Sequence, residues 1–261
     1  MAAPHNPFKA ALAAGRVQWG FWQSLASATV AEVSARAGFD WLLIDGEHGP
    51  NTLASLREQL VAIEATRAPV HPIARVVVND TARIKQILDL GYQTVLVPLV
   101  ETAGEAEAAA RAMRYPPEGV RGAGVSVVRA SGYGTDPDYL TTANREVCCL
   151  VQAETARAID NLEAICAVEG VDGVFIGPSD LSVSLGRPGG ARSPEVQAVI
   201  EDAIRRIRAA GKAPGILMPD PGLVARYLEL GALFIAVGSD VATLAQGARA
   251  TAERFRALAA G

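Results

Sequence analysis

Two acidic residues, Glu154 and Asp180, stand just after two consecutive apolar runs of this 261-residue sequence. If the runs are neighbouring strands of one parallel sheet, they lie about 4.8 Å apart and the two carboxylates meet at one edge. Paired carboxylates suit a hard cation such as Mg²⁺ or Mn²⁺, with water and substrate oxygens as further ligands. The alternative is that each carboxylate caps a helix N-terminus, a role that suits Asp180. We favour the metal site.

His48 is the candidate general base. It follows Asp45 by three residues, and a carboxylate that accepts one ring N–H leaves the other ring nitrogen free to take a proton. The alternative is a histidine that binds only backbone atoms. The other two histidines are poorer candidates, because His5 lies in the N-terminal segment and His71 precedes an apolar run instead of following one.

Arg75 ends another apolar run, where a buried arginine needs an anion. Either Asp45 or Glu47 could hold it as a structural pair, or its guanidinium could bind an oxyanion of a substrate. Spacing alone gives the two roles equal weight, and they are compatible with each other.

The segment Gly177-Pro178-Ser179-Asp180 has the pattern of a turn from a strand into a helix. Proline is favoured at the first helical position, so Pro178 indicates where the helix begins. Free backbone N–H groups at such a point could bind a substrate carboxylate. The alternative is an ordinary tight turn, which is the commoner case.

Eight short, nearly all-apolar runs are the strands that would position these residues. They are Gln18–Trp22, Trp41–Ile44, Pro72–Val76, Thr94–Pro98, Cys148–Gln152, Gly173–Ile176, Pro214–Leu217 and Phe234–Val237. Amphipathic segments such as Ala156–Val168 lie between them and end at Gly or Pro. This alternation predicts a (β/α)₈ barrel, whose catalytic groups lie at the C-terminal strand ends. An open doubly wound sheet is the alternative, weakened because no GxGxxG follows the first run.

Two segments depart from the alternation. Tyr115–Arg145 is long and rich in Gly and Pro, and could hold an extra strand at Gly124–Val128 and a helix near Asp138–Ala143. Leu185–Pro194 contains three glycines, and we expect it to cover a site or to flex.

The composition excludes several classes of protein. Half of the residues are hydrophobic, enough for one barrel domain over residues 1–261. The net charge of −4 and the lack of a basic cluster argue against nucleic acid. We see neither a secretory signal nor a membrane span. Cys148, Cys149 and Cys166 fall in apolar segments, so we expect reduced core thiols and a cytoplasmic protein.

Several motifs together resemble the HpcH/HpaI family of metal-dependent (class II) pyruvate aldolases. They are Trp41-Leu-Leu-Ile-Asp-Gly-Glu-His48, Gln152-Ala-Glu154 and Val174-Phe-Ile-Gly-Pro-Ser-Asp-Leu181. Further matches at Ile84–Gly91, Leu96–Pro98 and Tyr115–Gly122 keep the order of the family over nearly the whole chain. The resemblance implies a reversible aldol reaction between an aldehyde and a 2-keto acid, pyruvate or hydroxypyruvate. It also implies a divalent metal ion, Mg²⁺ or Mn²⁺, although Co²⁺ or Zn²⁺ would also fit.

The resemblance implies roles for the catalytic residues. Glu154 and Asp180 match the metal ligands of the family, and His48 and Asp45 match the base and its partner. Arg75 matches the group that steadies the ketone oxygen as it becomes an enolate.

The resemblance further implies contacts for the substrate and for assembly. Contacts near the metal and the keto-acid carboxylate are expected from Gln152, Gly177, Pro178 and Ser179. Trp22 is expected as a pocket wall, and Asp89 as a residue that reaches the site of a neighbouring subunit. The family implies a homohexamer, a trimer of dimers whose last helix is exchanged between subunits.

Three other functions are alternatives to a metal-dependent aldolase. A Schiff-base aldolase needs a lysine at a C-terminal strand end, but Lys9, Lys85 and Lys212 fall elsewhere in the sequence. A lyase of acyl-CoA substrates would need a basic groove, which the sequence lacks. A non-catalytic keto-acid-binding barrel would not need a base, an arginine and two carboxylates together.

Overall fold

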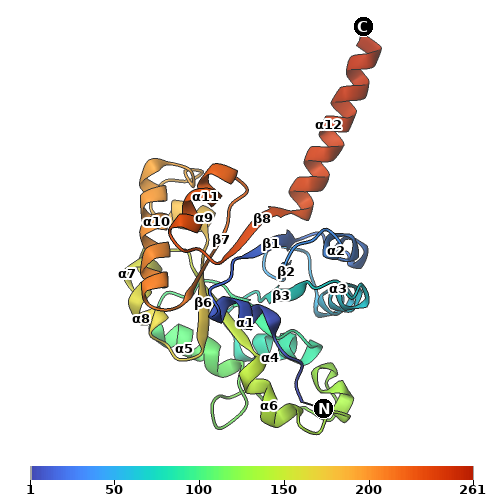
Figure 1. Ribbon diagram of the computed structural model, residues 1–261, viewed down its shortest axis with the longest axis vertical. Helices are drawn as coiled ribbons and strands as arrows, with labels where there is room; N and C mark the ends of the chain where they lie inside the picture. Colours follow the sequence, from blue (N-terminus) through green and yellow to red (C-terminus); the bar gives the residue numbers. More distant parts are fainter. Residues whose placement is uncertain (1, 261) are drawn as a thin grey trace.

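The apolar runs form eight parallel strands that close into a barrel in the computed structural model, which describes residues 2–260 (Figure 1). The strands are β1 (Gln18–Gln23), β2 (Trp41–Asp45), β3 (His71–Arg75), β4 (Thr94–Val97), β5 (Cys148–Ala153), β6 (Val171–Ile176), β7 (Ala213–Leu217) and β8 (Phe234–Ser239). Each strand pairs with the next along the chain, and β8 pairs with β1. The predicted (β/α)₈ barrel is therefore confirmed, and the open-sheet alternative is wrong.

Helices alternate with the strands, and most of them cover the outside of the barrel. They are α1 (Pro7–Ala13), α2 (Ala28–Ala35), α3 (Leu53–Ala65), α4 (Thr81–Leu90), α5 (Ala103–Ala112), α6 (Tyr139–Glu146), α7 (Ala156–Asp160), α8 (Leu162–Cys166), α9 (Pro178–Ser184), α10 (Pro194–Ala209), α11 (Pro221–Glu229) and α12 (Asp240–Ala260). Most begin at a side-chain cap, as where Thr52 and Thr102 accept backbone N–H groups of the first turns of α3 and α5. The predicted helix at Ala156–Val168 is divided into α7 and α8 at Asn161.

The long connection between α5 and β5 contains no extra strand. The expected strand at Gly124–Val128 is wrong, because this segment forms a turn in which the N–H of Val127 donates to the carbonyl of Gly124 (3.0 Å). A short 3₁₀ helix, Arg129–Gly134, follows the turn. The barrel is already closed by β4 and β5, so the segment has no sheet edge to pair with. The expected helix near Asp138–Ala143 is confirmed as α6.

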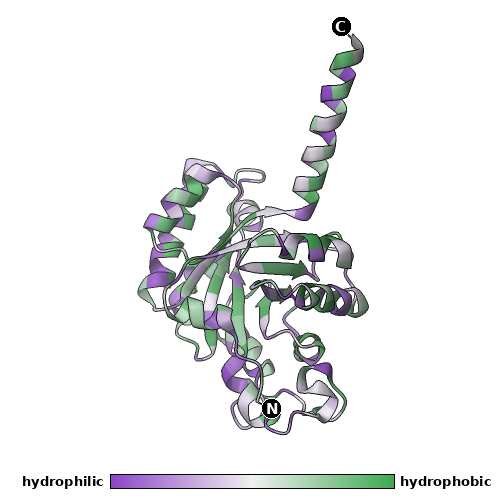
Figure 2. Ribbon diagram, turned by 45° about the vertical axis from the view of Figure 1, so that its right-hand side comes forward, coloured by the Kyte–Doolittle hydropathy of each residue, from purple (hydrophilic) through white to green (hydrophobic). Residues whose placement is uncertain are grey.

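Two buried layers hold the barrel together. The outward faces of the strands pack against the helices, whereas the barrel interior is filled by side chains such as Trp41, Leu43 and Phe175. Helix α1 closes the N-terminal end, where Phe8 packs edge-on against Trp41 and Phe234. Figure 2 shows the green apolar strands inside a more polar helical layer. Among the described residues, this packing leaves the opposite, C-terminal end of the barrel as the place where a ligand would enter from solvent.

Helix α12 extends away from the barrel (Figure 1). Its described contacts with other elements are near its start, with β1 and β8, and its side chains Leu244, Phe255 and Leu258 are exposed. The carboxylate of Asp240, its first residue, accepts the backbone N–H groups of Ser24 (3.0 Å) and Leu25 (2.9 Å), just after β1. Within residues 2–260, no helix is long and apolar enough to span a membrane.

Candidate active site

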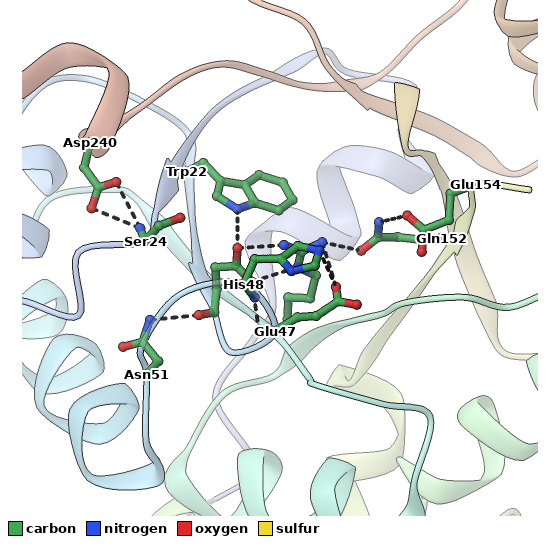
Figure 3. A network of polar contacts seen from close by, with 10 residues as sticks. Trp22, Ser24, Glu47, His48, Asn51, Gln152, Glu154 and Asp240 are labelled. Carbon is green, nitrogen blue, oxygen red and sulfur yellow. Dashed lines mark hydrogen bonds and ion pairs between the residues drawn. The ribbon is translucent and has the colours of Figure 1, made fainter. Parts of the chain in front are cut away.

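The ends of β2 and β3 place Asp45 beside Arg75, its register partner in the sheet. The two side chains form a buried two-point ion pair, with Nε of Arg75 2.8 Å from Oδ1 of Asp45 and an Nη atom 2.6 Å from Oδ2. Trp22 Nε1–H donates to the same carboxylate at 3.0 Å (Figure 3). Burial opposes ionisation of Asp45, but the bonds and charge of Arg75 keep the pKa of Asp45 below its ordinary value.

Arg75 is held by further neighbours. Its other Nη atom lies 2.8 Å from Oε2 of Glu47 and 3.3 Å from Oε1 of Gln152. The guanidinium also lies 5.0 Å from the ring centre of Trp22. The sequence left Asp45 and Glu47 as alternative partners of this arginine, and both hold it. Its charge is therefore fixed in position at the rim, which suits a group that must stabilise an oxyanion without rearranging.

Glu154 follows β5 and is buried against two donors. The side-chain amide of Gln152 donates to Oε2 at 2.6 Å, and the backbone N–H of Leu99 donates to Oε1 at 2.9 Å. Gln152 thus connects Arg75 to Glu154 (Figure 3). Burial raises the pKa of Glu154, and the charges of Asp180 and Glu47 raise it further, against the effect of Leu99.

The turn after β6 brings Asp180 towards Glu154. Helix α9 begins at Pro178 with Gly177 as its N-cap residue, and Asp180 lies in the first turn. A Cβ atom on Gly177 would come within 2.5 Å of Oε2 of Glu154, so glycine is needed for this approach. The capping alternative does not apply, because Thr155 caps α7 and Gly177 occupies the cap position of α9.

A divalent cation fits this set of donors. Burial raises the pKa of Glu47 as well as that of Glu154, and the negative charge of Asp180 raises both further, so ionisation of these two carboxylates is opposed in the absence of a cation. A cation between them would remove that penalty. Among residues 2–260, no group of three or more acidic, His or Cys side chains is placed to enclose a metal. Mg²⁺ typically binds only a few protein ligands and leaves its other coordination positions to water and substrate.

The ring of His48 lies at the mouth of the site. Its side chain is 69% exposed, and Nε2 is 4.0 Å from Oε2 of Glu47. Asp45 accepts the backbone N–H of His48 at 3.2 Å, while the contacts described for the Asp45 carboxylate do not include the ring. The expected ring contact with Asp45 is thus replaced by proximity to Glu47, because Arg75 and Trp22 occupy the Asp45 oxygens. Glu47, which the sequence singled out only as an alternative partner of Arg75, is part of the site.

A cavity of about 450 Å³ joins most of the expected residues. It is lined by Trp22, His48, Arg75, Gln152, Phe175, Gly177, Pro178, Ser179, Asp180, Ala191, Arg192, Leu217, Met218 and Pro219. The sequence analysis missed Arg192, although it lies in the loop that we expected to cover a site. It also missed the segment after β7, whose apolar residues carry no signal of chemistry.

Asp89 is not brought to this cavity within one chain. It lies on α4, where Oδ1 is 2.9 Å from a guanidinium nitrogen of the buried Arg121. The lysines are also elsewhere. Nζ of Lys9 and Nζ of Lys212 donate to backbone carbonyls around the N-terminal strand ends, and Lys85 lies on α4.

A family model described as HpcH/HpaI aldolase/citrate lyase matches residues 18–247, which include the whole barrel. The chain belongs to this family. The 4-hydroxy-2-oxo-heptane-1,7-dioate aldolase of Klebsiella pneumoniae is 56% identical over 96% of this chain and 94% of that protein. The hydroxypyruvate/pyruvate aldolase of Cupriavidus necator is 54% identical over 97% of this chain and 93% of that protein. An HpcH/HpaI family crystal structure from Burkholderia cenocepacia superposes with a TM-score of 0.92, at 39% identity over 96% of this chain and 99% of that one.

Proposed function

We propose that this HpcH/HpaI family member is an aldolase that joins and cleaves a 2-keto acid and an aldehyde with the help of a divalent metal ion. As a carbon–carbon lyase, it would use pyruvate or hydroxypyruvate as donor, the donors in the name of a relative 54% identical to it. One observation carries the proposal. Two carboxylates, a held guanidinium and an accessible imidazole meet at the C-terminal end of one barrel, where such enzymes place their catalytic groups.

Glu154 and Asp180 are the residues that would hold the ion, Mg²⁺ or Mn²⁺ by preference, although Co²⁺ or Zn²⁺ would also suit a site with two carboxylates. The chemistry supplied by such an ion is polarisation of the substrate ketone, which lowers the pKa of the neighbouring C–H group. The side-chain amide of Gln152 donates to Oε2 of Glu154 and so restrains the carboxylate.

The other residues of the site bind the substrate and stabilise the charge that develops on it. Arg75, fixed by Asp45 and Glu47, stabilises negative charge on the ketone oxygen as the enolate forms. The backbone N–H groups at the start of α9, together with Gln152, receive the carboxylate of the keto acid. Trp22 forms one wall and keeps water from the reacting carbon.

His48 transfers the proton in both directions. In synthesis its ring takes a proton from the carbon next to the ketone and returns it to the alkoxide formed from the aldehyde. In cleavage it takes the proton of the 4-hydroxyl group and returns it to the enolate carbon. Oε2 of Glu47 lies 4.0 Å from Nε2 of His48, so we assign the supporting role to Glu47 and a positioning role for Arg75 to Asp45.

Metal removal tests the proposal. The purified protein, treated with EDTA, is expected to lose aldol addition between pyruvate and an aldehyde and to regain it with Mn²⁺ or Mg²⁺. Loss of the methyl-proton signal of pyruvate in D₂O, followed by NMR, measures enolisation without any aldehyde. Activity that survives exhaustive chelation would contradict the proposal. Borohydride treatment with pyruvate is expected to trap no adduct, since no described lysine lines the cavity.

We further propose a cytoplasmic homohexamer, a trimer of dimers in which α12 packs on another subunit. Support comes from an apolar groove of about 460 Å³ between α2 and the start of α12, lined by residues such as Phe21, Val33 and Leu244. The exposed apolar residues of α12 need such a surface. In this assembly Asp89 would act at the site of a neighbouring subunit.

A further inference from the structure

We propose that Arg192 selects aldehyde acceptors that carry an anionic group, a carboxylate or a phosphate. The inference rests on the proposed aldolase function and deepens it by naming the class of acceptor. Arg192 lies in the loop between α9 and α10 and lines the same cavity as His48 and Asp180.

The charges of the cavity show why this arginine is free to bind a substrate. Arg75 is 6% exposed, and its guanidinium is engaged by Asp45, Glu47 and Gln152. The side chain of Arg192 is 63% exposed, and its described ion pair, with Asp220, is long at 3.5 Å. An exposed pair of this kind contributes about 0–1 kcal/mol. A carboxylate or phosphate that meets the guanidinium at two points forms a stronger, directed contact and can displace it.

The position of Arg192 assigns it to the acceptor. The donor is expected at Gln152 and the start of α9, which leaves Ala191, Arg192 and the segment Leu217–Pro219 to line the rest of the cavity. Among the described lining residues the other guanidinium, that of Arg75, is already engaged by Asp45 and Glu47, so an anionic acceptor would depend on Arg192 for a free cation. Arg192 supplies positive charge at the part of the cavity where we place the far end of the aldehyde.

Asp220 holds the guanidinium loosely in this place. Its Oδ1 accepts the N–H groups of Gly222 (2.9 Å) and Leu223 (3.1 Å) and so caps α11, which leaves Oδ2 for Arg192. An Asp220→Asn substitution keeps a capping oxygen, because asparagine is as good an N-cap as aspartate, but removes the competing charge.

The test compares matched aldehydes with pyruvate and Mn²⁺. Succinic semialdehyde is paired with butanal, and glyceraldehyde 3-phosphate with glyceraldehyde, so that the two pairs distinguish carboxylate from phosphate. We expect the wild-type enzyme to have the lower KM for the charged member of at least one pair. In Arg192→Gln, KM for that charged aldehyde should rise about 10-fold or more while KM for its neutral partner stays the same.

Arg187→Gln is the matched control, because Arg187 is an exposed arginine of the same loop that is not among the lining residues. Arg187→Gln is expected to leave KM unchanged for both the charged and the neutral aldehyde. Asp220→Asn is expected to lower KM for the charged aldehyde. The inference is overturned if wild type prefers neither charged aldehyde, if Arg187→Gln matches Arg192→Gln, or if Arg192→Gln raises KM for both members alike, as a structural latch would. Pyruvate deuterium exchange separates this result from failure of the aldolase function, because exchange needs no acceptor.

Discussion

Asp45 and Arg75 are register partners at the ends of adjacent strands, and their carboxylate and guanidinium meet at two points. The charge that would stabilise the enolate is therefore fixed by the sheet rather than by a loop. Because β2 and β3 hold both backbones, the arginine needs no rearrangement when negative charge develops beside it.

Replacement of Arg75 tests this arrangement. Arg75→Ala should lower kcat/KM by on the order of 10²–10³ while Mn²⁺ still binds, since Glu154 and Asp180 are unchanged. The same change leaves Asp45 buried without its main partner, which should cost about 3–5 kcal/mol of stability. Arg75→Lys keeps the charge but not the two-point contact, so we expect it to fold better and to remain slow. Wild-type turnover in either variant would refute the role.

Metal binding should stabilise the protein in a way that depends on Asp180. A ligand that binds only the folded state stabilises it by about 2.7 kcal/mol at 100 times its Kd. Differential scanning fluorimetry of the EDTA-treated protein should therefore show a rise in Tm when Mn²⁺ is added. Asp180→Asn should abolish the rise, whereas Asp160→Asn, at an exposed position on α7, should retain it. An equal rise in both variants would place the metal elsewhere.

The catalytic role of His48 can be tested without a change in the stability of the protein. His48→Gln should lower both pyruvate deuterium exchange and aldol turnover by about 10²–10⁴, the usual contribution of a general base. The side chain is mostly exposed, so stability should change by no more than about 0.5 kcal/mol. His5→Gln, at the exposed N-terminal segment, is the control. Normal exchange in His48→Gln would show that another group removes the proton.

His71, at the N-terminal end of the barrel, should make stability depend on pH. Burial lowers the pKa of His71 to about 3, from an ordinary value of 6.5. Between these values the unfolded chain binds a proton that the folded chain does not, so stability falls as pH decreases from 6.5. The loss should reach about 1.4 kcal/mol per pH unit. Urea unfolding from pH 7.5 to 4.5 should show a shallower decline for His71→Gln than for wild type; parallel curves would contradict the assignment.

Removal of α12 tests the proposed assembly. A chain that ends at Ser239 lacks the exposed Leu244, Phe255 and Leu258, and should therefore be monomeric or dimeric by light scattering, whereas the full chain is expected to be hexameric. A milder variant, Leu244→Arg, places a charge in the apolar groove and should weaken assembly in the same direction. A full chain that is monomeric at micromolar concentration would contradict the hexamer.

The sequence predicted what local patterns determine. Strand runs, helix ends and the positions of Glu154 and Asp180 follow from apolar periodicity and from the rule that polar residues follow strands. Contacts across the chain were harder to predict. The spacing of Asp45 and His48 suggested a contact between their side chains. The register of β2 and β3 instead places Asp45 beside Arg75, 30 residues away, and the two side chains form an ion pair.

Two further errors have a similar physical origin. The apolar run at Gly124–Val128 has the composition of a strand, but a strand also needs a free sheet edge, and β4 and β5 already pair with each other. Arg192 lies in a glycine-rich loop with no periodicity, so only the folded chain shows that it lines the cavity. Local signals thus predicted the barrel and the order of polar residues after its strands, whereas the surroundings of the proposed acceptor depend on loop geometry.

The hydrogen bonds that Asp240 accepts from the backbone of Ser24 and Leu25 could make turnover depend on protein concentration. They tie the first turn of α12 to the residues just after Trp22, a wall of the cavity. If the proposed hexamer forms, a reorientation of α12 when the subunits dissociate would therefore displace the rim of the site directly. Dilution should then reduce catalytic efficiency while circular dichroism still reports an intact barrel, which would make quaternary structure a determinant of turnover in this enzyme.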